Sequence, residues 1–89
     1  MLLSQVTITV ENGGQRRKVW FFFESDHEDL ADLHDALVAD GSVFGQRLES
    51  EPDGRGGRRI TSRFDFVLSG DVVATICPPT YAITEGARQ

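Results

Sequence analysis

The chain has 89 residues, of which 39% are hydrophobic, and a formal net charge of −5. This length allows one domain, residues 1–89, and the apolar fraction is sufficient for a folded core. No apolar run approaches the roughly 20 residues that a membrane-spanning helix needs. The first five residues lack the charged and apolar regions of a signal peptide. A single cysteine excludes an internal disulfide framework and a Cys-based zinc cluster. We therefore expect a cytoplasmic protein without a membrane segment.

The first strands in chain order are predicted by alternating apolar residues. Residues 6–10 alternate between Val or Ile and Thr, which is typical of a half-buried strand. Asn12-Gly13-Gly14 favours a hairpin turn, because Asn and Gly tolerate positive φ. Residues 15–23 then form the second strand. The register that matches apolar with apolar and acid with base joins Glu11 to Arg16, Ile8 to Val19 and Val6 to Phe21.

One amphipathic helix is predicted after this hairpin. Ser25 and Glu28 have the spacing of a capping box, so the helix should run from Asp26 to Asp40 and end at Gly41 in the left-handed conformation. The helical period predicts an apolar arc that faces the core and an acidic arc that faces solvent. The apolar arc contains His27, Leu30, Ala31, Leu33, His34, Leu37 and Val38. The opposite arc contains Glu28, Asp29, Asp32, Asp35, Ala36, Ala39 and Asp40.

The remaining residues predict three more strands over 43–51, 59–68 and 72–76, a flexible loop over 52–57, an extended edge segment over 80–83 and a frayed tail over 85–89. In the fourth strand Ile60, Phe64, Phe66 and Leu68 should share one face. The order ββαβββ predicts an α+β fold, in which an antiparallel sheet of four to five strands carries one amphipathic helix on one face.

One helix leaves the other face of the sheet open. Trp20 and Phe22 should lie on that face, where burial of each ring would stabilise the fold by about 2–3 kcal/mol. Three covers are consistent with the sequence. They are the C-terminal segment around residues 78–83, a second copy of the chain in a homodimer, and a partner or ligand.

The sequence offers little for catalysis or metal binding. His27 and His34 lie about 10.5 Å apart along a helix axis, too far to share one metal ion. Cys77 has no local signature of a nucleophile. The loop from Gly54 to Arg59 lacks the Lys-Ser/Thr ending of a phosphate-binding loop. We therefore predict no catalytic residue, no metal and no cofactor; an enzyme of this size would need a site between subunits.

The uneven distribution of charge gives the first functional hypothesis. Seven of the 14 acids lie between Glu24 and Asp40, a segment without Lys or Arg. This pattern fits a solvated helix face, and it also fits an acidic surface that docks on a basic, nucleic-acid-binding protein partner. In size and charge the chain resembles small phage-encoded inhibitors, including anti-CRISPR proteins, and its residue usage is compatible with a bacterial or phage origin. The predicted partner-binding residues are Glu28, Asp29, Asp32, Asp35 and Asp40.

The alternative hypothesis is binding of single-stranded nucleic acid by the open sheet face. Lys18, Trp20, Phe22 and Arg63 would offer rings for stacking beside cations. The glycine- and aromatic-rich motif of RNA-recognition domains is absent, and the pI near 4.8 counts against this hypothesis.

Overall fold

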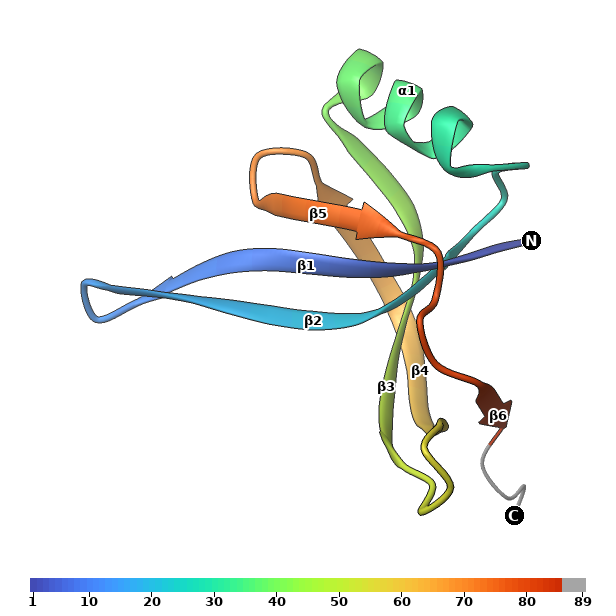
Figure 1. Ribbon diagram of the computed structural model, residues 1–89. Helices are drawn as coiled ribbons and strands as arrows, with labels where there is room; N and C mark the ends of the chain where they lie inside the picture. Colours follow the sequence, from blue (N-terminus) through green and yellow to red (C-terminus); the bar gives the residue numbers. More distant parts are fainter. Residues whose placement is uncertain (86–89) are drawn as a thin grey trace.

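A six-stranded mixed sheet with one helix forms the α+β architecture of this computed structural model, which describes residues 1–85 (Figure 1). The strands lie in the order β5-β1-β2-β3-β4-β6 across the sheet. The elements in chain order are β1 (Leu2–Asn12), β2 (Gln15–Ser25), α1 (Leu30–Asp40), β3 (Ser42–Pro52), β4 (Arg58–Ser69), β5 (Val73–Cys77) and β6 (Ile83–Glu85).

The expectation of a purely antiparallel sheet of four to five strands is wrong in the number of strands, which is six, and in the direction of one strand, which is parallel to its neighbour. The sixth strand, β6, lies parallel to β4 and starts only at Ile83, the last residue of the segment predicted as extended over 80–83. Arg58 N–H donates to the carbonyl of Ala82 at 2.8 Å and starts this pairing. Glu85, predicted to belong to a frayed tail, is the last residue of β6; the rest of that predicted tail lies outside the described residues.

The predicted register of the first hairpin is confirmed. Glu11 pairs with Arg16, Ile8 with Val19 and Val6 with Phe21. Gly13 and Gly14 turn the chain with φ of 61° and 82°, in the left-handed region that glycine adopts without strain. The Arg16 side chain lies 3.0 Å from the carboxylate of Glu11, so charge and apolar pattern agree on one register.

The two long hairpins diverge from a short junction. β2 pairs with β3 only at Phe22, Phe23 and Glu24, and beyond these residues β1–β2 and β3–β4 extend in different directions (Figure 1). Gly45 makes the junction close, because a side chain there would collide with the carbonyl of Glu24 and the ring of Phe23. The junction therefore depends on a residue without a Cβ atom.

The helix is shorter than predicted at its N-terminus. It starts at Leu30 with Asp29 as N-cap, whose carboxylate accepts from Asp32 N–H at 2.8 Å. The predicted cap Ser25 is instead the buried last residue of β2, and its hydroxyl is 2.9 Å from His27 Nδ1. The predicted C-terminal stop at Gly41 is confirmed, with φ of 79°.

The apolar arc of the helix is only partly buried. Leu33 and Leu37 are buried against the sheet, and Leu30 and Ala36 pack beside them. The prediction was wrong for Ala36, which was placed on the outer arc, and for three residues placed on the buried arc. Ala31, His34 and Val38 are exposed, because the helix meets the sheet along a narrower stripe than its apolar arc offers.

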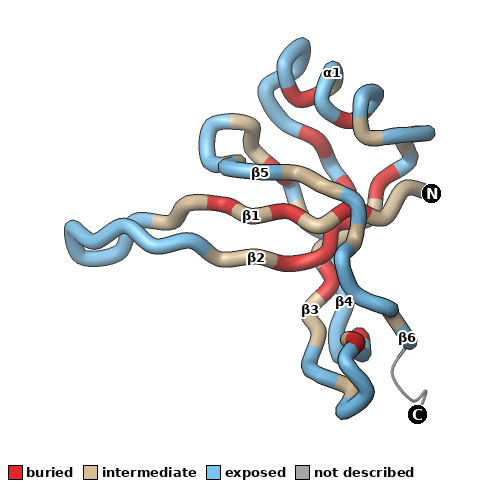
Figure 2. The backbone as a smooth tube through the Cα atoms, in the orientation of Figure 1, coloured by how far each residue is buried: buried red, intermediate tan, exposed pale blue. Residues whose placement is uncertain are grey.

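Two apolar clusters lie on the two faces of the sheet. The larger, on the helix side, joins Leu33 and Leu37 to Val6, Ile8, Phe21, Phe23, Val43 and Leu68. The smaller, on the other face, contains Phe22, Leu48 and Ile60 (Figure 2 shows the buried segments in red). The prediction that Ile60 shares a face with Phe66 is wrong. The register shifts between Glu49 and Ser50, and this irregularity in the β3–β4 ladder moves Ile60 to the opposite face.

The C-terminal segment covers the second face, as the first of the three predicted arrangements stated. The Tyr81 ring stacks on Trp20 with centroids 5.6 Å apart and an interplanar angle of 15°. The guanidinium of Arg58 lies 5.1 Å from the Trp20 ring, and Ile83 packs on the cluster around Phe22. Intramolecular packing thus buries Phe22 and half-buries Trp20.

Candidate functional site: an acidic helix beside an apolar groove

The five carboxylates predicted to bind a partner are all exposed. They are Glu28, Asp29, Asp32, Asp35 and Asp40. Within residues 1–85 none of them lies within ion-pair distance of a Lys or Arg side chain; the one basic group nearby is the His34 ring, 4.0 Å from Asp35. The structure therefore gathers these side chains on α1 and on the turn before it.

Most acids on the strands, in contrast, form ion pairs with arginines. Arginines pair with Glu11, Glu49 and Glu51 at 3.0, 2.9 and 2.6 Å. Arg63 holds both Glu24, at 2.6 Å, and Glu85, at 2.9 Å. Five of the six carboxylates on the strands thus pair with arginines, and the sixth, Asp65, accepts from the Gln46 amide at 3.3 Å, whereas the carboxylates of α1 have no Lys or Arg partner among residues 1–85.

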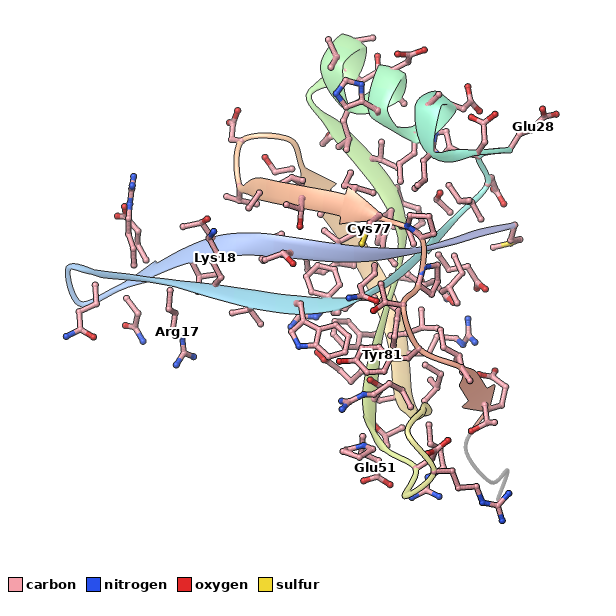
Figure 3. All side chains as sticks on the ribbon, in the orientation of Figure 1. Arg17, Lys18, Glu28, Glu51, Cys77 and Tyr81 are labelled. Carbon is pink, nitrogen blue, oxygen red and sulfur yellow. The ribbon has the colours of Figure 1, made fainter. Side chains whose placement is uncertain are left out.

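The charge separation extends across the molecule. Glu28 lies in the turn before α1, and Arg17 and Lys18 lie on the β1–β2 hairpin, away from α1 (Figure 3). The two cations are exposed, and among the described residues neither has an acidic partner within ion-pair distance. The unpaired carboxylates of α1 and these two unpaired cations therefore lie on different parts of the molecule.

Local hydrogen bonds explain only part of the acidic surface. Asp29 caps the helix, and Asp32 in its first turn suits the positive end of the helix dipole. Asp35 lies in the middle of α1 and Asp40 in its last turn, which carries no basic residue. A carboxylate at the negative end of a helix is unfavourable by a few tenths of a kcal/mol. Helix stability therefore does not account for Asp35 and Asp40.

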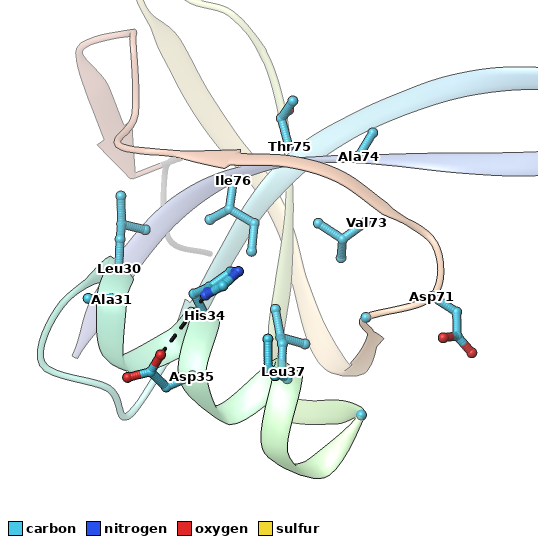
Figure 4. A pocket seen from close by; sticks show the side chains of 13 residues that line it. Leu30, Ala31, His34, Asp35, Leu37, Asp71, Val73, Ala74, Thr75 and Ile76 are labelled. Carbon is cyan, nitrogen blue, oxygen red and sulfur yellow. Dashed lines mark ion pairs between the residues drawn. The ribbon is translucent and has the colours of Figure 1, made fainter.

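An apolar groove borders this acidic surface. It lies between α1 and β5 and has a volume of about 710 Å³. Leu30 and Leu37 of the helix face Val73 and Ile76 of the strand across it (Figure 4). Its lining also includes the exposed stripe of the helix that the sequence had placed in the core, namely Ala31, His34 and Val38.

Two acids stand at the rim of the groove. Asp35 on α1 and Asp71 in the turn before β5 contribute to its lining (Figure 4). Both are exposed, so their charge faces solvent at the groove mouth. Sequence reasoning missed Asp71 and the strand residues of the groove. One signal in the sequence could have indicated the groove. The predicted apolar arc of the helix is wider than the stripe that a helix buries against one sheet, so part of it had to remain exposed.

The residues of the alternative nucleic-acid site do not form an open platform. Phe22 is fully buried, and Trp20 lies between Tyr81 and Arg58. Arg63 is engaged by two carboxylates, which leaves Lys18 as the freely exposed member of the set. In this arrangement the rings have their stacking partners within the chain.

Other reactive side chains are dispersed. Cys77 is half-buried with its sulfur 3.7 Å from the carbonyl of Gln5, and His27 bonds to Ser25. In the loop after β3 the Asp53 carboxylate accepts from the backbone N–H groups of Arg55 and Gly57, which lowers its pKa from the ordinary 3.8. This loop is therefore held by hydrogen bonds between the Asp53 side chain and the loop's own backbone.

Among residues 1–85 no three His, Cys, Asp or Glu side chains are arranged to hold a metal ion, and no helix has the length and apolarity to cross a membrane. Comparison of the chain with protein-family models, curated proteins and solved structures finds no match. The functional interpretation therefore depends on the geometry of the acidic helix and its groove.

Proposed function

We propose that the protein is a non-enzymatic binding module that docks the acidic face of α1 on a basic surface of a protein partner. The observation that carries the proposal is that several exposed carboxylates gather on α1 and that none of them has a Lys or Arg partner among residues 1–85. Within residues 1–85, strand carboxylates such as Glu24 and Glu51 pair with arginines, whereas Asp32, Asp35 and Asp40 pair with none. Unpaired surface carboxylates keep their attraction for an incoming cationic surface.

The partner proposed is one that normally binds nucleic acid. A surface that binds phosphates carries Lys and Arg side chains, and a cluster of carboxylates can compete for the same cations. The protein would then act as an inhibitor of the kind encoded by phages, by occupying a nucleic-acid-binding surface. Charge attraction of this type accelerates association and weakens as salt screens it.

A displacement experiment tests the proposal. A fluorescent single-stranded oligonucleotide is bound to an oligolysine peptide, and the protein is added at about 50 mM and about 300 mM NaCl. We expect the oligonucleotide to be released at low salt and release to fall steeply at high salt. Direct binding of the oligonucleotide by the protein itself would favour the nucleic-acid alternative and contradict this proposal.

Matched variants locate the effect. Asp32→Asn/Asp35→Asn removes two charges from α1, and Glu51→Gln/Asp65→Asn removes two from exposed positions on β3 and β4. Both pairs leave the same net charge. We expect the first pair to reduce displacement about tenfold and the second pair less than about twofold. Equal losses would mean that net charge alone is responsible and would overturn the role of α1.

A further inference from the structure

The lining of the groove between α1 and β5 is apolar and only partly covered. Leu30, Val73 and Ile76 are half-buried there, and Val38 is 72% exposed. The groove volume of about 710 Å³ is in the range of sites that bind small organic groups. An apolar side chain that entered the groove would remove its own surface and that of these residues from water. The groove is therefore a favourable place for an apolar group.

The formal charges that line the groove are all negative. They belong to Asp35 on α1 and to Asp71 in the turn that leads into β5. Among the described residues no Lys or Arg contributes to this lining, and neither carboxylate lies within ion-pair distance of one. The remaining titratable side chain is that of His34, which projects from α1 toward β5 (Figure 4). This charge pattern favours a ligand that combines an apolar group with cations and disfavours one with anions.

The groove is continuous with the acidic face of α1. Ala31 and Asp35 line the groove and also line a shallow depression formed with Glu28, Asp29 and Asp32. A partner side chain in the groove would therefore bring its neighbours on the same surface close to the carboxylates of α1. One partner surface can contact the groove and the acidic face together.

We propose that the groove receives an apolar side chain of the partner protein that has Lys or Arg side chains on the same face. This apolar side chain would be an anchor at the centre of the contact, and the cations beside it would meet Asp35 and Asp71. Residues two apart on a strand, or three or four apart on a helix, share a face and lie about 5–7 Å from each other. The inference rests on the proposed function and adds this sequence pattern to the basic surface that is bound.

Charge distinguishes this occupant from a second copy of the chain. Each chain has a net charge of −5, and the carboxylates on α1 have no Lys or Arg partner among residues 1–85. Two chains docked at this face would bring like charges together. A basic partner surface is attracted to the same place.

Two capped nine-residue peptides with a fluorescent label test the inference. The first is Lys-Ser-Lys-Ser-Leu-Ser-Lys-Ser-Lys, in which the lysines share the face of Leu when the chain is extended. The second has Ser in place of Leu and the same charge. At about 50 mM NaCl we expect the Leu peptide to bind about tenfold more tightly, since Leu alone enters the groove. The methyl resonances of Val73 and Ile76 should shift strongly only with the Leu peptide.

The outcomes separate the groove from the acidic face. Equal affinity of the two peptides, with unshifted methyl resonances, would overturn the anchor and leave the acidic-face proposal standing. Failure of both peptides to bind would overturn the proposed function itself. A third peptide keeps Leu and has Glu in place of Lys, and we expect it not to bind. Binding as tight as that of the lysine peptide would contradict the role of Asp35 and Asp71.

Two adjacent positions on α1 provide matched variants. Val38 lines the groove and Ala39 does not, both side chains are exposed, and Arg at either position adds the same charge to the helix. The ratio of the affinities for the Leu and Ser peptides cancels the general effect of that charge. We expect this ratio to fall below about twofold in Val38→Arg, because the added side chain fills the groove mouth, and to stay near tenfold in Ala39→Arg. Equal ratios in the two variants would contradict the proposal. Shifts of the Ile76 methyl resonances that grow with protein concentration without peptide would identify a second copy as the occupant and overturn it.

Discussion

Tyr81 stacks on Trp20 at a centroid distance of 5.6 Å, and this contact closes the face of the sheet that α1 leaves open. Tyr81 comes from the segment between β5 and β6, and Trp20 from the middle of β2. Arg58 lies beside both rings, 5.1 Å from Trp20 and 5.8 Å from Tyr81. The C-terminal segment therefore takes the place that a dimer partner or ligand would otherwise occupy.

Removal of this stack should loosen the C-terminal segment. We expect Tyr81→Ala to lower the free energy of unfolding by about 1–2 kcal/mol, because an aromatic pair and its buried area are lost. Trp20 fluorescence should shift to longer wavelength as water reaches the ring. Tyr81→Phe retains the ring and should leave both the emission and the denaturation midpoint near those of the unaltered protein. An unchanged emission in Tyr81→Ala would contradict the stacked arrangement.

Gly45 should be the least replaceable glycine of the sheet junction. A Cβ atom there would collide with the carbonyl of Glu24 and the Phe23 ring, so Gly45→Ala should cost about 2–4 kcal/mol. Gly70→Ala is the control, since the nearest atoms to its Cβ would be 3.5 Å away. Urea denaturation compares the two variants. Similar midpoints would show that the β2–β3 junction is not as close as described.

Arg47 should stabilise the fold through aromatic rings as well as through its ion pair. Its guanidinium carbon lies 4.2 Å from the Phe21 centroid and 5.4 Å from that of Phe66, and its side chain is 20% exposed. We expect Arg47→Ala to cost about 1–2 kcal/mol. Arg59→Ala breaks a more exposed pair and should cost about 0.5 kcal/mol or less by thermal denaturation. Equal costs would show that the rings around Arg47 contribute nothing.

The loop after β3 should become disordered when the pH falls through the pKa of Asp53. The two backbone donors lower the pKa of Asp53 below its ordinary 3.8, so the ionised form favours the folded loop. This stabilisation is complete above about pH 3.8 and is lost as the pH falls through the lowered pKa. The amide resonance of Gly57 should follow that titration. In Asp53→Asn the same resonance should not titrate in this range; a titration that persists would point to another group.

Local patterns predicted the elements well where one residue type determines the backbone. The Asn-Gly-Gly turn located the first hairpin, and Gly41 located the end of the helix. Both could be predicted because few residues other than glycine adopt a positive φ without strain. The predicted capping box failed because Ser25 could serve either a helix or a strand end, and tertiary burial decided between them. A local pattern does not reveal which of two such roles the rest of the fold will require.

Long-range features of the structure were less accessible from the sequence. The irregularity that moves Ile60 to the other face depends on pairing between β3 and β4. The parallel pairing of β6 with β4 and the groove beside β5 depend on where distant segments meet. The acidic surface was predictable, because charge on one helix face follows from spacing alone. Its apolar neighbour was not, because the exposed part of the helix arc depends on how the helix packs.

Charge reversal on the helix tests the docking role of α1 most directly. Binding of the oligolysine peptide is measured by fluorescence anisotropy with Asp32→Lys/Asp35→Lys and with the matched variant Glu51→Lys/Asp65→Lys, at about 50 mM NaCl. We expect the helix variant to lose affinity by about a hundredfold and the strand variant by less than about fivefold, since only the first changes the docking surface. Equal loss of affinity in the two variants would contradict a docking role for α1.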